Sequence, residues 1–201
     1  MWCLAFFSSS ETDVTQRRAI FLDRDGVINA NRPDHVKSWD EFVFLPRGLD
    51  ALRQIAASDF VVLVTTNQAA IARGQTSDAA VRDIHARMTA AVASAGGRID
   101  AVYYCPHLPE ENCECRKPRT GLYRQGARER DIDLARSYVV GDAMADIVAA
   151  RAIGAMPILV LTGRGNEQHG VLKENNHSGY HVADDLMSAV EWIWKKEKLA
   201  L

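Results

Sequence analysis

Apolar runs about as long as a β-strand alternate along this chain with segments whose apolar residues recur at helical spacing. The strand-like runs cover residues 18–23, 60–66, 101–105, 137–141 and 157–161. The segments with helical spacing cover residues 49–57, 77–95, 121–130, 143–153 and 185–196. Strands separated by helices pair in parallel within a shared sheet. This order therefore predicts a doubly wound α/β fold with a mostly parallel sheet and helices on both faces.

The chain length of 201 residues suits one domain with a substantial core. We expect residues 1–17 to form a poorly ordered tail and residues 18–201 to form a single domain, in which segment 163–181 is a loop without an identifiable role. The formal net charge of −2 provides no basic field for nucleic acid, and no apolar run is long enough to cross a membrane. The start lacks the features of a secretory signal. Three of the four cysteines crowd beside a histidine, which fits a reducing, cytoplasmic setting, and we expect a monomer.

Two carboxylates follow the first predicted strand, Asp23 and Asp25, and Gly26 comes directly after them. In open α/β sheets, ligands bind beyond the carboxyl ends of the strands. Two carboxylates held close together repel unless a cation or a proton intervenes. The pair therefore suits Mg²⁺, with one carboxylate as nucleophile and the other as proton donor. The plain alternative is an Asp-Gly turn; a calcium loop would need further acidic residues that are missing.

The ends of other predicted strands carry complementary groups. Thr66 and Asn67 follow the second strand and offer a phosphate cradle, and Lys117 lies in the loop before the fourth strand. Asp142 follows the fourth strand and could complete a magnesium shell, with Asp146 one helical turn later. Taken singly, these are compatible with a local turn, a solvated lysine and a helix N-cap. Together they supply the parts of one phosphoryl-transfer site.

The loop over residues 105–119 contains a set of metal-binding side chains. Three cysteines and one histidine offer three thiolates and one imidazole, namely Cys105, His107, Cys113 and Cys115. That set fills the tetrahedral coordination of a structural Zn²⁺ and leaves no position for water. The alternative is a group of reduced cysteines without metal. Zinc would brace a proline-containing loop that has little core of its own.

Several segments, in order, resemble the haloacid dehalogenase (HAD) superfamily: residues 21–29 (FLDRDGVIN), 66–68 (TNQ), 105–107 (CPH), 115–118 (CRKP) and 140–142 (VGD). Within it, the chain is similar to the D-glycero-D-manno-heptose 1,7-bisphosphate 7-phosphatases, and histidinol-phosphate phosphatases share much of the pattern. The resemblance implies a HAD-like Rossmannoid domain. It also implies that loop 105–119 binds zinc and stands where many relatives carry a large cap domain, so we expect an open site.

The resemblance also implies a role for each catalytic residue. Asp23 is the nucleophile that becomes aspartyl phosphate, and Asp25 protonates the leaving oxygen and then activates water. Thr66 and Lys117 hold the transferring phosphoryl group. Magnesium is bound by the Asp23 side chain, the Asp25 carbonyl and Asp142. Phosphoryl transfer depends mainly on in-line positioning and charge neutralisation, which these groups supply.

The segment Ile71-Ala72-Arg73-Gly74 resembles the heptose phosphatases, and Arg73 with Arg116 could bind the second phosphate of a bisphosphate. The sequence departs from that group at Ala69-Ala70 and at Thr120, and the short spacing in the zinc loop is typical of histidinol-phosphate relatives. The leading hypothesis is therefore removal of the 7-phosphate from heptose 1,7-bisphosphate. Histidinol phosphate or another small phosphorylated metabolite remains an alternative substrate.

Two hypotheses without catalysis also remain. The chain could be a degenerate sugar-phosphate-binding protein, although the catalytic positions are intact. It could be a zinc module that binds nucleic acid or a partner protein, but three acidic residues beside the zinc ligands would repel a phosphate backbone, namely Glu110, Glu111 and Glu114. We therefore expect a small phosphorylated molecule as the ligand, and neither nucleic acid nor a membrane.

Overall fold

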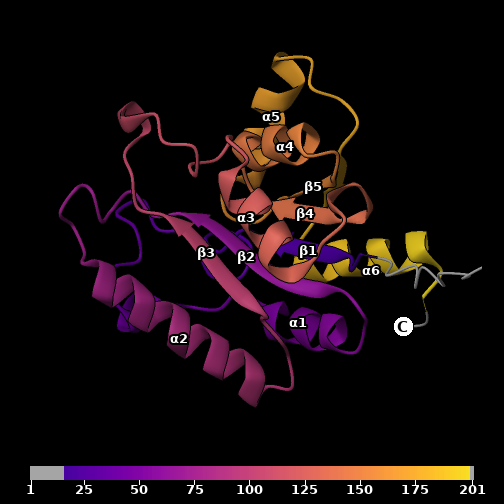
Figure 1. The fold of residues 1–201 in the computed structure, drawn as a ribbon, viewed down its shortest axis with the longest axis horizontal. Coiled ribbons are helices and arrows are strands. Elements are labelled where there is room, and N and C mark those ends of the chain that lie inside the picture. The colour runs from indigo at the N-terminus through magenta and orange to yellow at the C-terminus, as the bar shows by residue number, and fades with distance from the viewer. Residues whose placement is uncertain (1–15, 200–201) are drawn as a thin grey trace, which may run out of the picture.

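A computed structural model of the protein describes residues 16–199, which form a six-stranded parallel sheet with the order β3-β2-β1-β4-β5-β6 (Figure 1). All five strand pairs are parallel. The strands are β1 (Ala19–Leu22), β2 (Val61–Asn67), β3 (Ala101–Cys105), β4 (Tyr138–Gly141), β5 (Met156–Val160) and β6 (His181–Ala183). The strand order reverses between β2 and β4, on either side of β1, so the loops after these strands meet at a switch point where such sheets bind ligands.

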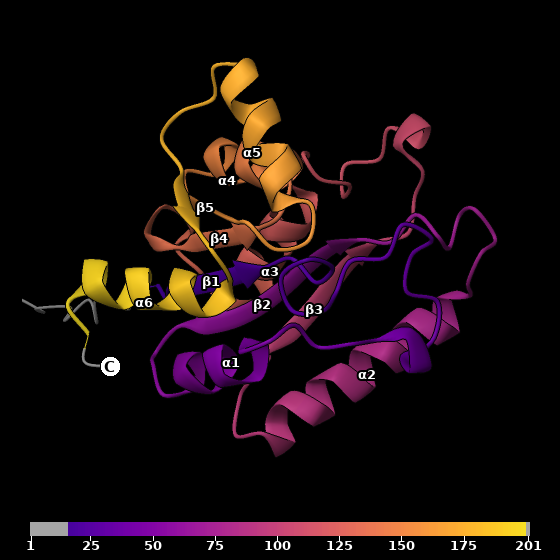
Figure 2. The ribbon, with the colours of Figure 1, turned by 180° about the vertical axis from the view of Figure 1, so that it is seen from behind.

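Helices cover both faces of the sheet, as the alternating pattern predicted (Figure 2). The α-helices are α1 (Gly48–Ala56), α2 (Asp78–Ser94), α3 (Gly121–Arg130), α4 (Met144–Ala152), α5 (Gly165–Glu174) and α6 (Leu186–Glu197). Helices α1, α2 and α6 pack on one face of the sheet, and α3, α4 and α5 pack on the other. The predicted doubly wound fold is confirmed, and residues 16–199 contain no large cap domain.

Alternate residues of the central strands supply the two halves of the core. Ile20 and Leu22 of β1 pack in the cluster with α1, α2 and α6, whereas Ala19 and Phe21 pack in the cluster with α3 and α4. Successive side chains of a strand point to opposite faces, so a strand covered on both sides must be apolar at every position. This explains why β1 is continuously apolar in the sequence and fully buried.

The ends of several helices lie where the sequence predicted them. The Ser77 side chain accepts a hydrogen bond from the Ala80 N–H at 3.1 Å and caps α2, and Gly96 follows that helix with a positive φ. Gly154 has a positive φ just after α4. Asp185, which the prediction included in the last helix, is instead its N-cap and accepts from the Ser188 N–H.

The expectation of a loop over residues 163–181 is wrong. This segment contains α5, and β6 begins at its last residue, on the edge of the sheet. Helix α5 buries Leu172 as its one large apolar side chain, and β6 has three residues. A helix with so few buried apolar residues, and a strand of three residues, produce no clear periodic pattern in the sequence.

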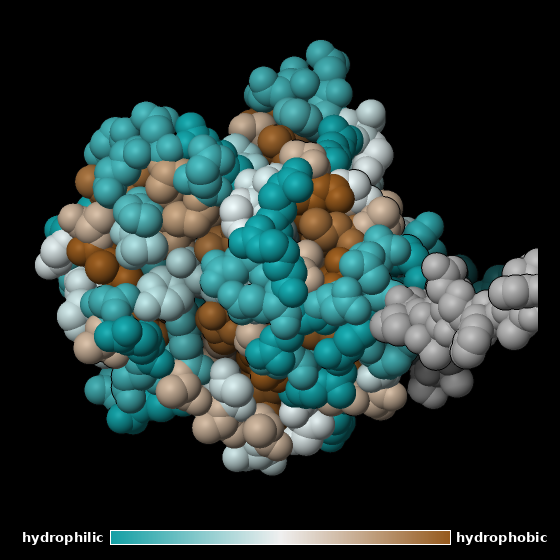
Figure 3. Space-filling view, viewed as in Figure 1, coloured by the Kyte–Doolittle hydropathy of each residue, from teal (hydrophilic) through white to brown (hydrophobic). Residues whose placement is uncertain are grey.

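Hydrophilic residues cover most of the face shown in Figure 3, with hydrophobic residues in smaller patches among them. Within residues 16–199, the helices are too short or too polar to cross a membrane. Residues 1–15 of the predicted tail, including Cys3, lie outside the described part of the chain. Arg17 already contacts the domain, since its N–H donates to the Asp131 carbonyl and its carbonyl accepts from the Asp133 N–H.

Candidate active site

The loops after β1, β2 and β4 and the loop that follows β3 line one cavity of about 390 Å³ at the switch point of the sheet. The walls include most of the side chains that the sequence analysis predicted to form the site: Asp23, Asp25, Thr66, Asn67, Arg73, Arg116, Lys117 and Asp146. Each of the first three loops starts at the carboxyl end of a buried strand. The backbone of the sheet therefore brings together residues that lie far apart in the sequence.

Lys117 lies at the floor of this cavity, between two carboxylates. Its ammonium is 3.0 Å from Asp23 and 2.6 Å from Asp146, and it also donates to the Thr65 carbonyl at 2.8 Å. Burial opposes the charged ammonium, but the two carboxylates more than compensate and raise the pKa of Lys117 above its ordinary value. The lysine is therefore a fixed positive charge directly beside Asp23.

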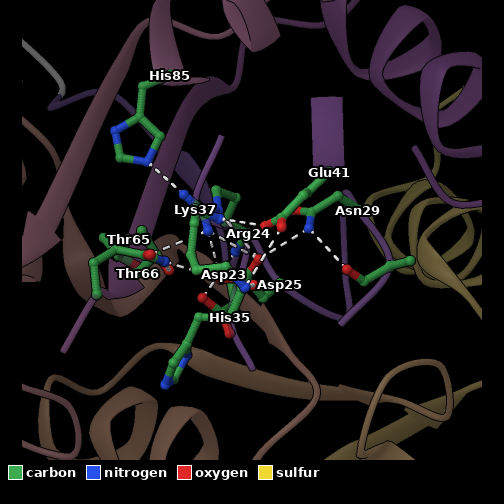
Figure 4. Close-up of polar contacts among 12 residues, drawn as sticks. Asp23, Arg24, Asp25, Asn29, His35, Lys37, Glu41, Thr65, Thr66 and His85 are labelled. Carbon is green, nitrogen blue, oxygen red and sulfur yellow. Dashed lines mark hydrogen bonds and ion pairs between the residues drawn. The ribbon is translucent and has the colours of Figure 1, made fainter. Parts of the chain in front are cut away.

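Asp25 is held by three neighbouring side chains, of which Figure 4 labels Arg24 and Asn29. Arg24 donates to both carboxylate oxygens, Asn29 donates to one at 2.9 Å, and Gln68 donates to the other at 2.9 Å. Burial would raise the pKa of Asp25, but the charge of Arg24 and these hydrogen bonds outweigh it and lower the pKa. Asp25 lies beyond the end of β1, so these three donors set the direction of its carboxylate.

Arg24 is completely buried, which is unusual for an arginine (Figure 4). Its guanidinium is 3.1 Å from Nε2 of His85 on α2 and 3.1 Å from the Gln68 amide oxygen. Burial, together with the charge of Arg24, lowers the pKa of His85 to about 3, so the imidazole is neutral and can accept this hydrogen bond. His85 and Gln68 thus hold the arginine that orients Asp25.

Three buried carboxylates form a second group of metal-binding side chains. The oxygens of Asp23, Asp142 and Asp146 lie within 4.8 Å of one another. Burial, and then the charge of Asp23, raises the pKa of Asp142 to about 7. Oδ1 of Asp142 is buried and accepts no hydrogen bond within the described chain, and the Arg164 guanidinium lies 3.8 Å from it. A cluster of carboxylate oxygens with a buried acceptor that lacks a hydrogen bond fits the oxygen ligands that Mg²⁺ requires.

Asp142 does not act as a helix N-cap. The N-cap position of α4 is Ala143, and the Asp142 carboxylate instead accepts a hydrogen bond from the Arg164 N–H at 2.9 Å. The local alternative considered for this aspartate is therefore wrong.

The four predicted zinc ligands lie together in loop 105–119. Sγ of Cys113 is 3.5 Å from that of Cys105 and 3.3 Å from that of Cys115, and Nδ1 of His107 is 3.3 Å from the Cys115 sulfur. Ligand atoms about 2.3 Å from a shared ion in tetrahedral geometry lie roughly 3.8 Å apart. The cluster is slightly tighter than that, and its chemistry fits Zn²⁺.

The three predicted substrate-binding residues each contact a different part of the site. Asn67 exchanges two hydrogen bonds of 3.1 Å with the backbone of Lys117, so its amide is engaged in placing that loop. Arg73 lies 2.9 Å from Nε2 of His35 at the cavity wall. Arg116 lines the cavity and donates to the His107 carbonyl at 3.2 Å.

Comparisons with known proteins identify the family to which this site belongs. The HAD-hydrolase-like family model matches residues 114–189. A D-glycero-β-D-manno-heptose-1,7-bisphosphate 7-phosphatase from Bordetella bronchiseptica is 42% identical over 178 residues, which are 88% of this chain and 97% of the relative. The chain belongs to this family of heptose bisphosphate phosphatases. A member from Pseudomonas aeruginosa is 41% identical over 149 residues, which are 74% of this chain and 84% of the relative.

Solved structures of this heptose bisphosphate phosphatase family share the fold. The crystal structure of the B. bronchiseptica phosphatase, complexed with magnesium and phosphate, has a TM-score of 0.83 and 40% identity, covering 89% of this chain and 99% of that one. The structure from Burkholderia thailandensis has a TM-score of 0.68 and 35% identity, covering 88% and 98%. The predicted HAD superfamily membership and the prediction of a phosphatase are confirmed.

Sequence reasoning had assigned no role to three residues that contact Asp25 and Asp142 in this structure. Arg24 and Gln68 orient Asp25, and Arg164 binds Asp142 through its backbone. Arg24 and Gln68 lie inside the motifs that carried the resemblance, so those motifs could have drawn attention to them. Arg164, just before α5, lies in no such motif. Their roles depend on contacts between separate loops.

The raised pKa of Asp142 leads to a prediction about the metal-free protein. An aspartate whose folded pKa lies above its unfolded value destabilises the folded state once pH exceeds the unfolded pKa. Between pH 4 and pH 7 that cost grows. We expect Asp142→Asn to raise the unfolding free energy of metal-free protein at pH 7.5 by on the order of 1–3 kcal/mol. Urea unfolding would measure this change in unfolding free energy. An equal increase at pH 3.5 would show that the charge of Asp142 is not its cause.

Proposed function

We propose that the protein is a Mg²⁺-dependent phosphatase that removes the 7-phosphate of D-glycero-β-D-manno-heptose 1,7-bisphosphate through a covalent intermediate on Asp23. The observation that carries this proposal is the convergence of Asp23, Asp25 and Lys117 at one cavity, with Asp142 in the carboxylate cluster around Asp23, in a chain whose relatives carry that name. The catalytic residues are Asp23, Asp25, Thr66 and Lys117. The metal ligands are the Asp23 side chain, the Asp25 carbonyl and Asp142.

In the first step, an Asp23 oxygen attacks phosphorus and the bond from phosphorus to the sugar oxygen breaks. Asp25 gives its proton to that leaving oxygen. In the second step, Asp25 takes a proton from water, the water oxygen attacks phosphorus, and the bond to Asp23 breaks to release inorganic phosphate. Thr66 and Lys117 hold the phosphoryl oxygens. A bound Mg²⁺ would neutralise charge on the carboxylates and the phosphoryl group.

Asp25 needs a proton before it can act as the acid, although Arg24 and its other donors keep it ionised in the free protein. A phosphate placed beside a carboxylate raises the pKa of that carboxylate by like-charge repulsion. Phosphate monoesters also carry a titratable proton near neutral pH, with a pKa of about 6. Substrate binding therefore supplies the proton and also raises the pKa of Asp25, so that the carboxyl group keeps this proton.

The second phosphate of the substrate binds Arg73 and Arg116 in this proposal, with Asn67 holding the Lys117 loop between them. Both arginines line the cavity wall, and Arg73 is paired with a histidine rather than with a carboxylate. An arginine without an acidic partner is available to a phosphate, which it binds through two parallel hydrogen bonds.

Arg73→Ala should therefore raise KM for the bisphosphate by roughly 10- to 100-fold, because one charged hydrogen-bonding group is worth about 1.5–3 kcal/mol. Its kcat should change little, since Arg73 contacts the part of the substrate that does not react. Steady-state phosphate release would measure both constants. Arg82→Ala on the exposed side of α2 is the matched control. An equal KM increase for heptose 7-phosphate, which lacks the second phosphate, would contradict this assignment.

Zinc is proposed to brace loop 105–119, which carries Arg116 and Lys117 into the cavity. We expect about one Zn²⁺ per chain by elemental analysis and loss of that zinc in Cys113→Ser. Activity should fall at least about tenfold in this variant at saturating Mg²⁺, because the loop loses the ion that folds it. Glu114→Gln, at an exposed side chain of the same loop, is the control. Full zinc content in Cys113→Ser would contradict the ligand assignment.

The decisive test compares phosphate release from D-glycero-β-D-manno-heptose 1,7-bisphosphate and from histidinol phosphate, each with Mg²⁺. Rapid release that stops after one phosphate from the bisphosphate supports the proposal. Preference for histidinol phosphate would retain the mechanism and overturn the substrate. Release from neither would overturn the proposed activity and favour the degenerate binder.

We further propose that the enzyme acts as a monomer in the cytoplasm. The three described cysteines are free thiols beside a histidine, which suits zinc binding in a reducing compartment. Light scattering of the zinc-loaded protein would test the monomer directly.

A further inference from the structure

The turn between β5 and α5 contacts two loops that carry proposed metal ligands. This turn consists of Thr162, Gly163 and Arg164, at the start of segment 163–181, to which the sequence analysis assigned no role. The Thr162 hydroxyl donates to the Gly26 carbonyl at 2.6 Å, and the Arg164 N–H donates to Oδ2 of Asp142 at 2.9 Å. The turn therefore binds the loop after β1 and the loop after β4 at the same time.

Gly163 allows the turn to approach both loops at close range. Its φ is +58°, and a Cβ added there would lie 2.3 Å from Oδ2 of Asp142 and 2.5 Å from the Gly26 Cα. A Cβ added at Gly26 would in turn lie 2.1 Å from the same Asp142 oxygen. These two glycines and the aspartate leave no space for even a methyl group between the three loops.

These contacts determine which way the Asp142 carboxylate faces. Oδ2 accepts a hydrogen bond from the Arg164 N–H, while Oδ1 is buried, accepts no hydrogen bond among the described residues and lies 3.8 Å from the Arg164 guanidinium. The Gly26 carbonyl that Thr162 holds is one peptide unit after the Asp25 carbonyl, a proposed magnesium ligand. The turn thus sets the spacing between Asp142 and the Asp23–Gly26 loop. Asp142 and that loop together contain all three proposed ligands.

We propose that Thr162, supported by Gly163, is a positioning residue that sets the Mg²⁺ affinity of this site by clamping its two ligand-bearing loops together. The inference rests on the proposed function, because it requires Asp23, Asp25 and Asp142 to be the ligands. Thr162 touches neither the substrate nor the reacting atoms and acts through Gly26. Partners of metal ligands commonly change metal affinity by about 10- to 100-fold when they are removed.

The test is titration calorimetry of Mg²⁺ into protein stripped of Mg²⁺ but still loaded with zinc. Thr162→Val keeps the side-chain shape and removes the hydroxyl, so we expect its Mg²⁺ Kd to rise at least about tenfold. Thr162→Ser keeps the hydroxyl and should bind Mg²⁺ nearly as the wild type does. The Mg²⁺ concentration for half-maximal phosphate release should follow the same order. KM for the substrate at saturating Mg²⁺ should not change.

Gly163→Ala should weaken Mg²⁺ binding more than Thr162→Val, because its methyl group displaces Asp142. Its matched control is Gly179→Ala, which introduces the same positive-φ strain at φ +72° away from the site, with the nearest atom a flexible arginine end at 3.4 Å. Wild-type Mg²⁺ affinity in Gly179→Ala would separate a local effect from general strain. Should Gly163→Ala fail to fold, the Val and Ser variants of Thr162 still test whether the turn sets the Mg²⁺ affinity.

Each outcome has a definite meaning. Unchanged Mg²⁺ affinity in Thr162→Val overturns the inference, as does an equal loss in Thr162→Ser, because the hydroxyl would then have no part in the effect. A wild-type protein that binds no Mg²⁺ would overturn the proposed function itself, and the inference with it. Normal Mg²⁺ binding by the wild type with a selective loss in Thr162→Val supports both.

Discussion

Asp23→Asn is expected to lower kcat for phosphate release by at least about 10⁴-fold, because an amide cannot act as the nucleophile that accepts the phosphoryl group. The fold should survive, since Lys117 keeps its 2.6 Å ion pair with Asp146. Steady-state phosphate release would measure the loss. Acid-quenched wild-type protein should retain label from ³²P-labelled substrate, and the variant should not.

A matched control for this variant is Asp83→Asn on α2. Asp83 is exposed and pairs with Arg87 on the helix surface, so its loss should leave kcat within about twofold. An Asp23→Asn protein that keeps activity within tenfold of the wild type would show that another group attacks phosphorus. Label trapped in that variant would point to the same conclusion.

Lys117→Met is expected to reduce both catalysis and stability. The ammonium lies between Asp23 and Asp146, and the variant would leave two buried carboxylates without their counter-charge. Breaking a buried ion pair from one side costs about 3–5 kcal/mol of unfolding free energy. Loss of a charge that holds the phosphoryl oxygens should lower kcat by about 10³-fold. Urea unfolding and phosphate release would measure the two effects.

The double variant Lys117→Met with Asp146→Asn separates these two effects. Removing the orphaned Asp146 charge should restore part of the lost stability, because a neutral amide costs less to bury than an unpaired carboxylate. It should restore no activity, since the positive charge beside Asp23 is still missing. Lys195→Met on the exposed surface of α6 is the control. Full stability in Lys117→Met alone would contradict the buried ion-pair network.

Local patterns in the sequence were enough to predict most of the fold. The continuous apolar runs at β1 and β2 predicted central strands, and the structure buries them on both faces. Ser77 predicted the start of α2. Such features depend on a few neighbouring residues, so they can be recognised without knowledge of the rest of the chain. Helix α5 was missed because Leu172 is the one large apolar side chain that this helix buries.

The order of strands and helices also indicated which polar residues meet, because the carboxyl ends of neighbouring parallel strands share one edge of the sheet. Asp23, Thr66 and Asp142 could be assigned to one site on that ground. The contacts that the surrounding side chains make there depend on how separate loops pack, which no local pattern contains. Arg24 is buried against His85, and Asn67 holds the Lys117 backbone.

The Thr162 turn is the clearest case of a role that the sequence could not reveal. Thr162 and Gly26 are separated by more than half of the chain, yet they share a 2.6 Å hydrogen bond. Hydrophobic periodicity reports which face of an element is buried, and it carries no information about the distance between two loops. That distance is decided by the packing of β1, β4 and β5 side by side, and so are the roles of the residues that span it.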